Sequence, residues 1–564
     1  MSTSSFDRLW DQWSHWAEVS PDAEAIIHYA GGKAEKRWTR GHLMIRARAF
    51  AGALAGAGVV PGDVCALVMR HHPDFYPLYL GIVGAGAVPA VLAYPNQRLH
   101  PDKFVHGLTG MATHSGLRWI ATERALEASL QPLVTGAASS VHALLFPLEW
   151  KLDSSAAPGR LAGADANPDQ PCLLQHSSGT TGLQKAVEFS HRTVLTHVRD
   201  VARAIALGPD DTIASWLPLY HDMGMIAAFQ LPLATGTRVV QLDPFEWVAA
   251  PGLLFQAMAD EGASIAWLPN FAYHLLADRV HDEEMEGLRL DRVRLLINCS
   301  EPVRADSHLR LLRKLEPVGL TPRALGACYA MAEATFAVTQ TAPGSPPREL
   351  AVSPAGLASG DVILVDTHAA ARVCVSSGAP LPGTRVRVVD DAGQDVGPGR
   401  VGELWIHSAT LFDGYRNRPD ETARVLQHGW YRSGDLGFCW DGEYYVIGRQ
   451  KDVIIVAGKN VYPEDVEAAV SAVPELIPGR IVAFGADDTS AGTELVCVVA
   501  ETLVVGETEQ QALRVAILRA AMAFDITVSR VYLAPPRWLI KSSAGKPSRK
   551  LNRERILSGA LEAL

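Results

Sequence analysis

Apolar, strand-like runs alternate with helix-like stretches along most of this chain. The runs that indicate buried strands are residues 64–69, 119–122, 213–217, 238–242 and 295–298, and the helix-like stretches include 47–57 and 253–261. In α/β folds each strand is followed by a crossover helix that packs on a largely parallel sheet. The alternation therefore predicts an α/β architecture with largely parallel sheets.

The pattern changes twice toward the C-terminal end. From about Thr384, short strands with turn signals indicate a β-rich subdomain that closes the large region, and after Gly448–Asp452 a tail of domain size alternates again. A chain of 564 residues is too long for one compact core. We predict an N-terminal domain over 1–448, made of two α/β subdomains and the β-rich subdomain, a junction at 449–452 and a small α/β domain over 453–564.

Charge and cysteine content exclude several classes of protein. A net charge of −10 argues against a general nucleic-acid binder, although Lys541–Arg555 forms a local basic patch. The seven cysteines are scattered and include no CxxC pair, which favours reduced thiols in a cytoplasm over disulfides or a zinc site.

Met1–Trp16 has no secretory signal pattern. The uncharged segment Phe75–Gln97 is broken by prolines and glycines, so we predict a buried helix running into a strand and no membrane span.

One loop concentrates the groups that bind a polyphosphate. Ser177–Lys185 holds four hydroxyls, two glycines and a lysine directly after the apolar run Cys172–Leu174. Backbone N–H groups and hydroxyls of such a loop can wrap phosphates, and the lysine adds a point charge. The spacing is not that of a Walker-A loop, and composition alone leaves open an ordinary surface loop. The phosphate-binding candidates are Ser177, Ser178, Gly179, Thr180, Thr181, Gly182 and Lys185.

Two motifs follow predicted strands, where α/β folds place ligand residues. Trp216–Gly224 carries His221, which could orient a bound acid, although a histidine in such a turn is also a common structural residue. Tyr329–Thr335 carries Glu333, a carboxylate suited to holding Mg²⁺ over phosphates. The alternative for Glu333 is the solvated start of a helix.

Two more motifs lie in the C-terminal part. Asp435 follows Gly434 on a tight turn and could accept two hydrogen bonds from ribose hydroxyls, and Arg449 could bind the same ribose or a phosphate. The motif Gly545-Lys546 presents a lysine on the basic patch. The alternative interpretation is that this segment is a solvated, frayed tail.

In order and spacing, these motifs resemble those of the adenylate-forming superfamily of acyl-CoA synthetases, fatty acyl-AMP ligases, luciferases and peptide-synthetase adenylation domains. The resemblance covers about residues 5–555. It is strongest to fatty acyl-AMP ligases and their acyl-CoA synthetase relatives, on the segments Leu217–Gly224, Pro269–Tyr273, Glu301–Arg304 and Met331–Thr335. An extra segment at about 352–374 falls where fatty acyl-AMP ligases carry an insertion that restrains domain movement.

The resemblance implies a reaction in two halves. A hydrophobic carboxylic acid and Mg·ATP give acyl-AMP and pyrophosphate, and the acyl group then passes to the thiol of CoA or of carrier-protein phosphopantetheine. Glu333 and Thr180 would hold Mg²⁺, Thr335 would touch the α-phosphate, and Lys546 would reach the carboxylate and α-phosphate oxygens. Asp435 and Arg449 would hold the ribose. The other expected nucleotide contacts, besides the phosphate loop, are Ser300, Glu301, Pro302, Tyr329, Ala330 and Met331.

The same resemblance implies an acid pocket and a moving domain. The acid pocket would be bordered by His221, Tyr220, Phe271, Ala272 and Tyr273, which are mostly apolar and suit a hydrophobic acid. The small domain would rotate on Lys451 between the two half-reactions. The basic patch could receive either the acidic surface of a carrier protein or the phosphates of CoA. The choice of acceptor and the existence of a homodimer are left open.

The chain departs from the family pattern where ATP is handled. Gln184 and Ala186 replace the usual proline and glycine of the phosphate loop, and Ala330 and Cys299 replace glycines near the nucleotide. These changes leave two alternatives open: an enzyme limited to thioester formation from a preformed acyl-AMP, and a non-catalytic relative that binds acyl-adenylates or carrier proteins. The catalytic and ribose-binding residues are all present, which favours the ligase.

Overall fold

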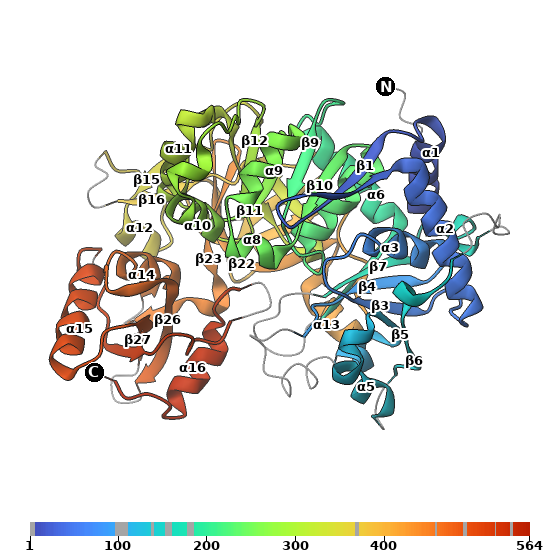
Figure 1. Ribbon diagram of the computed structural model, residues 1–564. Coiled ribbons are helices and arrows are strands. Elements are labelled where there is room, and N and C mark those ends of the chain that lie inside the picture. Colours follow the sequence, from blue (N-terminus) through green and yellow to red (C-terminus); the bar gives the residue numbers. More distant parts are fainter. Residues whose placement is uncertain are drawn as a thin grey trace.

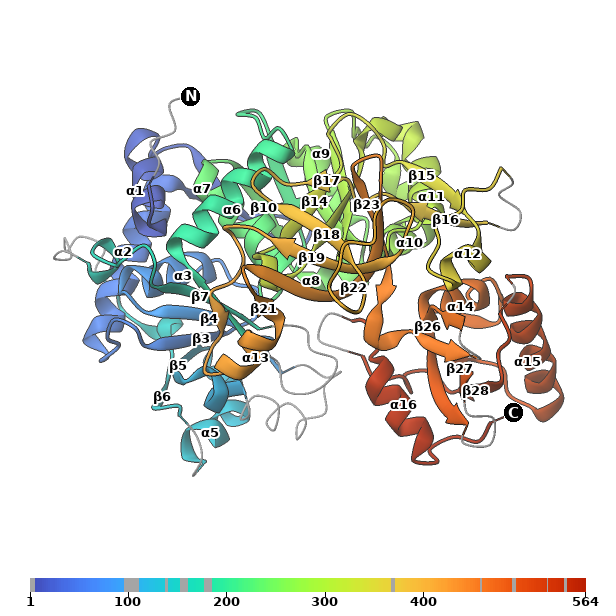
Figure 2. The same ribbon diagram turned by 180° about the vertical axis from the view of Figure 1, so that it is seen from behind.

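The computed structural model describes residues 6–95, 111–136, 140–152, 161–176, 185–366, 371–456, 459–488, 493–524, 526–541 and 545–563. Two large sheets with their helices form one body, and the C-terminal domain, drawn in orange to red, forms a smaller lobe beside it (Figure 1; Figure 2 gives the view from behind). Within the described residues, no helix is long and apolar enough to span a membrane.

The first large sheet has seven strands in the order β20-β8-β7-β4-β3-β5-β6. Its strands are β3 (Val64–Val68), β4 (Val88–Val91), β5 (Leu117–Thr122), β6 (Ala143–Leu145), β7 (Pro171–His176), β8 (Ala186–Ser190) and β20 (Gly414–Tyr415). The run from β6 to β7 is parallel, whereas β8 and β20 pair antiparallel. The uncharged segment begins as the fully buried helix α3 (Phe75–Gly84) and continues into β4, which confirms the predicted helix-to-strand order.

The second large sheet has nine strands in the order β17-β14-β13-β12-β11-β9-β10-β1-β2. They are β1 (Glu24–Ala30), β2 (Lys33–Thr39), β9 (Thr212–Ser215), β10 (Arg238–Leu242), β11 (Ile265–Pro269), β12 (Leu295–Cys299), β13 (Leu325–Ala330), β14 (Ala337–Gln340) and β17 (Ala379–Pro380). From β13 to β1 all neighbours are parallel, so these strands end at one edge. The two sheets confirm the predicted α/β architecture.

Helices fill the space between the sheets and cover their outer faces (Figure 1). Those of the N-terminal part include α1 (Leu9–Val19), α2 (Arg40–Gly56), α5 (Glu127–Thr135), α6 (His191–Ala204), α7 (Leu231–Thr235), α8 (Pro244–Ala249), α9 (Leu253–Glu261), α10 (Asn270–Arg279), α11 (Ala305–Leu315) and α13 (Pro419–Val425). Between the sheets, α3 packs on β4, α2 on β1 and β2, and α6 on β7 and β8.

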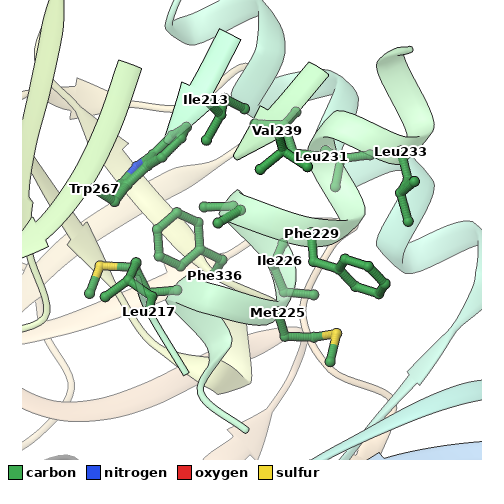
Figure 3. Close-up of a cluster of buried hydrophobic side chains, with 14 of the residues drawn as sticks. Ile213, Leu217, Met225, Ile226, Phe229, Leu231, Leu233, Val239, Trp267 and Phe336 are labelled. Carbon is green, nitrogen blue, oxygen red and sulfur yellow. The ribbon is translucent and has the colours of Figure 1, made fainter. Parts of the chain in front are cut away.

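A helix of π type, η4 (Met223–Gln230), runs through the largest hydrophobic core (Figure 3). Its Ile226 is buried on the side of Trp267 of β11 and Phe336, whereas Phe229 packs against Tyr79 with ring centroids 5.1 Å apart. Asp222 begins the helix because its carboxylate accepts the Met223 N–H at 2.9 Å. A Cβ atom at Gly224 would lie 2.3 Å from the Pro218 carbonyl oxygen, so only glycine allows this close turn. The core thereby fixes the loop that carries His221.

The β-rich subdomain is a five-stranded antiparallel sheet, as the short strands and turns predicted. It contains β18 (Arg385–Val389), β19 (Gly402–His407), β21 (Leu426–Gln427), β22 (Trp430–Trp440) and β23 (Glu443–Arg449). The insertion-like segment forms β15 (Glu349–Val352), α12 (Pro354–Ala358) and β16 (Arg372–Val375), with β15 and β16 paired antiparallel.

The C-terminal domain has hydrophobic clusters of its own. It begins after the 3₁₀ turn Gln450–Asp452 with the ribbon β24 (Ile454–Val456) and β25 (Lys459–Val461). A three-stranded sheet follows, with β26 (Leu476–Asp488), β27 (Thr493–Thr502) and β28 (Arg530–Ala534), covered by α14 (Pro463–Val470), α15 (Glu507–Met522) and α16 (Arg549–Leu557). The turn lies within the predicted junction at 449–452; the domain bounds and the movement at this junction stay predictions.

Five of the described histidines are fully buried and have a lowered pKa, which makes the stability of the fold dependent on pH. Burial lowers the pKa of His28 and His197 to about 3 and that of His176, His191 and His308 to about 4. The unfolded chain, with histidine pKa values near 6.5, binds protons first as the pH falls. The contribution of these histidines to the free energy of unfolding is therefore fully present above about pH 6.5 and is lost toward pH 4. The free energy of unfolding falls by up to about 1.4 kcal/mol per pH unit for each histidine. We expect the thermal midpoint to fall steeply between pH 6.5 and 5; a constant midpoint would contradict these burial effects.

Candidate active site

Asp435, Arg449 and Tyr329 meet at one point of the molecule. Strands β22 and β23 pair Asp435 with Arg449, and the Arg449 Nε lies 3.0 Å from one carboxylate oxygen of Asp435. The Tyr329 hydroxyl at the end of β13 donates to the other oxygen at 2.7 Å. Burial, together with the Asp435 charge, raises the pKa of Tyr329 well above its usual value, so the phenol stays a donor. The Asp435 carboxylate is thus held in a fixed orientation beside a guanidinium.

Glu333 lies on the 3₁₀ turn Ala332–Ala334 that follows β13. One of its carboxylate oxygens accepts a hydrogen bond from the Tyr415 hydroxyl at 2.7 Å. The Lys185 ammonium lies 4.3 Å from the centre of the Tyr415 ring and 2.8 Å from a carboxylate oxygen of Glu421. Tyr415 therefore connects the lysine of the predicted phosphate loop with the predicted magnesium ligand. The rest of that loop, residues 177–184, lies outside the described residues. It includes the phosphate-binding candidates Ser177, Ser178, Gly179, Thr180, Thr181 and Gly182, and also Gln184.

Thr335 has a positive φ of 65°, which is strained for a β-branched residue and is typical of functional turns. Its side chain is fully buried and donates a hydrogen bond to the Thr410 carbonyl at 2.7 Å. His197 supports the turn: Nδ1 lies 3.0 Å from the Thr410 hydroxyl and Nε2 accepts the Ala337 N–H at 3.0 Å. The hydroxyl of Thr335 is engaged with Thr410 in this structure, and its contact with an α-phosphate stays a prediction.

Lys546 reaches from the C-terminal domain to the end of β12, where its ammonium donates to the Ser300 carbonyl. Its charge also acts on the loop after β9. Burial lowers the pKa of His221 to about 4, and the Lys546 charge contributes to this; burial raises the pKa of Asp222 to about 6. The Nε2 atom of His221 is buried and has no hydrogen-bond partner among the described residues, so an acceptor or donor on a ligand could meet it.

Besides His221, the predicted residues of the acid pocket divide into two pairs. Tyr220 and Phe271 are partly buried, and the Phe271 N–H donates to the Glu301 carboxylate at 2.9 Å. Ala272 and Tyr273 are fully buried, and the Tyr273 hydroxyl donates to the Leu296 carbonyl at 3.1 Å. Tyr220 and Phe271 therefore border open space more directly than the other two.

The remaining predicted nucleotide contacts lie at the ends of two neighbouring parallel strands. Ser300, Glu301 and Pro302 follow β12, and Tyr329 and Ala330 end β13, with Met331 directly after it. Met331 is tied by its N–H to the Phe336 carbonyl at 2.8 Å. The described part of the predicted nucleotide site therefore follows one edge of the sheet.

Three of the departures from the family pattern cause no backbone strain. Ala186 begins β8, Cys299 ends β12 and Ala330 ends β13. Each has a negative φ, since none is among the described residues with a positive φ. The conformational freedom of glycine is therefore not needed at these positions. The pairing of β13 with β14 is irregular between Tyr329 and Ala330.

Besides the Lys546–Ser300 contact, two contacts that the sequence did not predict join the C-terminal domain to the body of the molecule. Arg372 of the insertion-like segment lies 2.8 Å from a carboxylate oxygen of Asp465 in α14 and donates to the Ile447 carbonyl at 2.8 Å. Arg304 donates to the Glu464 carbonyl at 2.9 Å. Both contacts hold α14 in the orientation that places Lys546 beside Ser300. Lys451 lies in the turn between the two bodies and is exposed.

The chain belongs to the AMP-binding enzyme family, whose profile matches residues 13–416. It is similar to the long-chain-fatty-acid–AMP ligase FadD26 of Mycobacterium marinum, with 29% identity over 537 residues that cover 90% of this chain and 89% of the relative. It is also similar to a probable long-chain-fatty-acid–AMP ligase, FadD30, of Mycobacterium tuberculosis, with 30% identity over 510 residues and 84% of each chain covered.

Solved structures agree with this placement. A structure from studies of the fatty acyl-adenylate ligases of E. coli and L. pneumophila has a TM-score of 0.90 and 26% identity, and the alignment covers 99% of each chain. The fatty acyl-adenylate ligase of L. pneumophila in complex with acyl adenylate and pyrophosphate has a TM-score of 0.73 and 25% identity, with 98% of this chain and 96% of that chain covered. The fold of the adenylate-forming enzymes is confirmed over nearly the whole chain.

Proposed function

We propose that this chain adenylates a hydrophobic carboxylic acid with ATP and passes the acyl group to a thiol. One observation carries the proposal: Lys546 of the C-terminal domain lies at the same sheet edge as Glu333 and the Asp435–Arg449 pair. An attacking carboxylate and an α-phosphate are both anionic, so bringing them together requires a fixed positive charge between them. The names of the similar ligases support an acyl-AMP as the product.

The chemistry assigns a role to each group. A carboxylate oxygen of the acid attacks the α-phosphorus, the bond to the bridging oxygen breaks, and pyrophosphate leaves with that electron pair. Lys546 would stabilise the charge on the carboxylate and α-phosphate oxygens. Asp435 would accept hydrogen bonds from the ribose hydroxyls while Arg449 holds the carboxylate in place. His221, uncharged at neutral pH, would face the acid.

The residues fit a magnesium ion that is shared with phosphates. Glu333 offers a hard oxygen ligand, and Tyr415 fixes its orientation. The described residues contain no cluster of three metal-binding side chains, which suits Mg²⁺ because it keeps waters and takes most of its remaining ligands from phosphates. Bound Mg²⁺ neutralises phosphate charge and orients the leaving group. Thr180, the second predicted ligand, lies outside the described residues.

The acceptor of the acyl group is the open part of the proposal. CoA and carrier-protein phosphopantetheine present the same thiol, and the basic segment Lys541–Arg555 suits the acidic partner of either kind. Two assays separate the alternatives: pyrophosphate release with ATP and a panel of acids, and thioester formation from a synthetic acyl-AMP. Activity in the second assay alone would favour the half-enzyme, and activity in neither would favour a non-catalytic binding protein.

Tyr415 is expected to act through Glu333. Tyr415→Phe removes the hydroxyl that orients the carboxylate, so we expect the Mg²⁺ concentration at half-maximal rate to rise about 10-fold or more. The KM for the acid should not change. Tyr444→Phe serves as the control because its hydroxyl bonds the Val386 carbonyl, away from Glu333. An unchanged Mg²⁺ dependence in Tyr415→Phe would refute the positioning role.

Arg372 is expected to restrain the C-terminal domain. Arg372→Gln removes the ion pair with Asp465, so the domain should leave its present orientation more often. We expect faster proteolytic cleavage near residues 449–452 and a higher rate of thioester formation from acyl-AMP. Arg400→Gln is a matched control, since Arg400 pairs with Asp361, a residue of the same body of the molecule. Equal cleavage rates in both variants would argue against the restraint.

A further inference from the structure

A pair of stacked tryptophans lies beside the predicted acid pocket. Trp216, the first residue after β9, and Trp247 of α8 lie with ring centroids 3.5 Å apart and ring planes within 5° of parallel. Trp216 is 4% exposed and Trp247 is 0% exposed. The Trp216 ring also meets the ring of Phe271, a predicted residue of the acid pocket, edge to face at 6.2 Å.

The order of the strands places this pair at the far end of the pocket. The predicted nucleotide site lies at the ends of β13 and β12. Lys546 contacts the end of β12 and His221 follows β9, so the reacting carboxylate of the acid is expected between the ends of these two strands. The tail of the acid must then extend away from the nucleotide, toward the ends of β11, β9 and β10. Phe271, Trp216 and Trp247 follow these three strands, so the tail meets the stacked pair.

Stacked rings at this distance leave no space for a hydrocarbon chain. A chain between them needs van der Waals contacts of about 3.5–4.0 Å on each side, so the rings would have to separate to about 7 Å. Both rings lie in a close-packed interior, where such a movement displaces neighbours.

Helix α8 is also anchored at its first turn. Asp243 caps it by accepting the N–H groups of Phe245 at 2.6 Å and Glu246 at 3.3 Å, and the Glu246 carboxylate accepts the Gly31 N–H at 3.0 Å. The Phe245 ring packs against Tyr94, with centroids 5.4 Å apart. These contacts fix the helix that carries Trp247, so the pair acts as a rigid floor.

We infer that Trp216 and Trp247 close the acid pocket and limit this enzyme to acids with short or compact tails. The inference rests on the proposed adenylation and specifies its substrate class. An acid that is one methylene group too long for a closed hydrophobic pocket typically has a kcat/KM about 10- to 200-fold lower than an acid that fits. The enzyme should therefore have a sharp limit of chain length, in contrast to relatives named for long-chain acids.

The test is pyrophosphate release with straight-chain acids from four to sixteen carbons. We expect the wild-type kcat/KM to fall at least about 10-fold within one or two methylenes of the limit. Trp247→Ala and Trp216→Ala should move the limit to longer acids. Trp247→Phe keeps an aromatic floor and should retain the wild-type limit. Trp13→Ala, which removes an equally buried indole in α1, controls for loss of stability without a change in the profile.

The outcomes separate the inference from the proposed function. If neither these acids nor compact branched and aromatic acids are used, adenylation itself is refuted. If the wild type uses long and short acids equally, or if folded Trp247→Ala keeps the wild-type limit, only the closed floor is refuted. Trp247→Leu and Trp216→Leu, with thermal unfolding measured beside activity, replace the alanine variants should these fail to fold.

Discussion

Lys546→Ala is expected to lower the rate of acid-dependent pyrophosphate release by about 100- to 1,000-fold, the usual effect of removing a preorganised group that stabilises transition-state charge. The structure provides the physical reason. Lys546 is bound to the Ser300 carbonyl and is close enough to His221 and Asp222 to alter the pKa of each. No other residue of the C-terminal domain is placed this way among the described residues.

The same variant distinguishes the two half-reactions. Thioester formation from a synthetic acyl-AMP should be nearly unchanged in Lys546→Ala, because the P–O bond to pyrophosphate is already broken. Lys550→Ala is the control: Lys550 lies on α16, and its half-exposed ammonium is 3.9 Å from a carboxylate oxygen of Glu554 in the same helix. Equal loss in both half-reactions would indicate damage to the domain, and full adenylation activity would remove Lys546 from the mechanism.

The second large effect is expected at Asp435. Asp435→Asn keeps the size of the side chain but replaces an acceptor oxygen with a donor. Hydrogen bonds to a charged group are worth about 1.5–3 kcal/mol each, so the KM for ATP should rise about 10- to 100-fold or more. The neutral amide of Asn also binds the Tyr329 hydroxyl and the Arg449 guanidinium more weakly than the carboxylate does, so the thermal midpoint of the variant should fall.

Asp441→Asn provides the matched control for this effect. Asp441 is on the exposed turn between β22 and β23, and its nearest ion-pair partner is Arg348 at 3.7 Å. Its KM for ATP should equal that of the wild type. If Asp435→Asn binds ATP as tightly as Asp441→Asn, the ribose is held elsewhere.

Local patterns predicted most of the fold. The strands at β3, β5, β9, β10 and β12 and the helix α9 lie where the apolar runs indicated. Buried strands of parallel sheets read as continuous apolar runs, so they can be found without knowing their neighbours. The resemblance implied that Asp435 and Arg449 hold the same ribose; their direct pairing across β22 and β23 emerges from the structure.

Contacts between distant segments could not be predicted in this way. Tyr415 belongs to a strand of two residues and meets Glu333 across 82 positions of sequence. The stacking of Trp216 on Trp247 depends on β9 and β10 being neighbours in the sheet. Arg372 and Asp465 carry no local signal that they pair. In each case the order of residues in the sequence does not indicate which of them are neighbours in space, because they come together only in the folded structure.

Acid-dependent exchange of labelled pyrophosphate into ATP tests the central claim most directly, because it requires a reversible adenylation and no thiol acceptor. The structure predicts exchange that depends on a carboxylic acid and Mg²⁺ and that falls about 100-fold or more in Lys546→Ala. Thioester formation from a preformed acyl-AMP without any such exchange, across acids of all chain lengths, would contradict an adenylating enzyme.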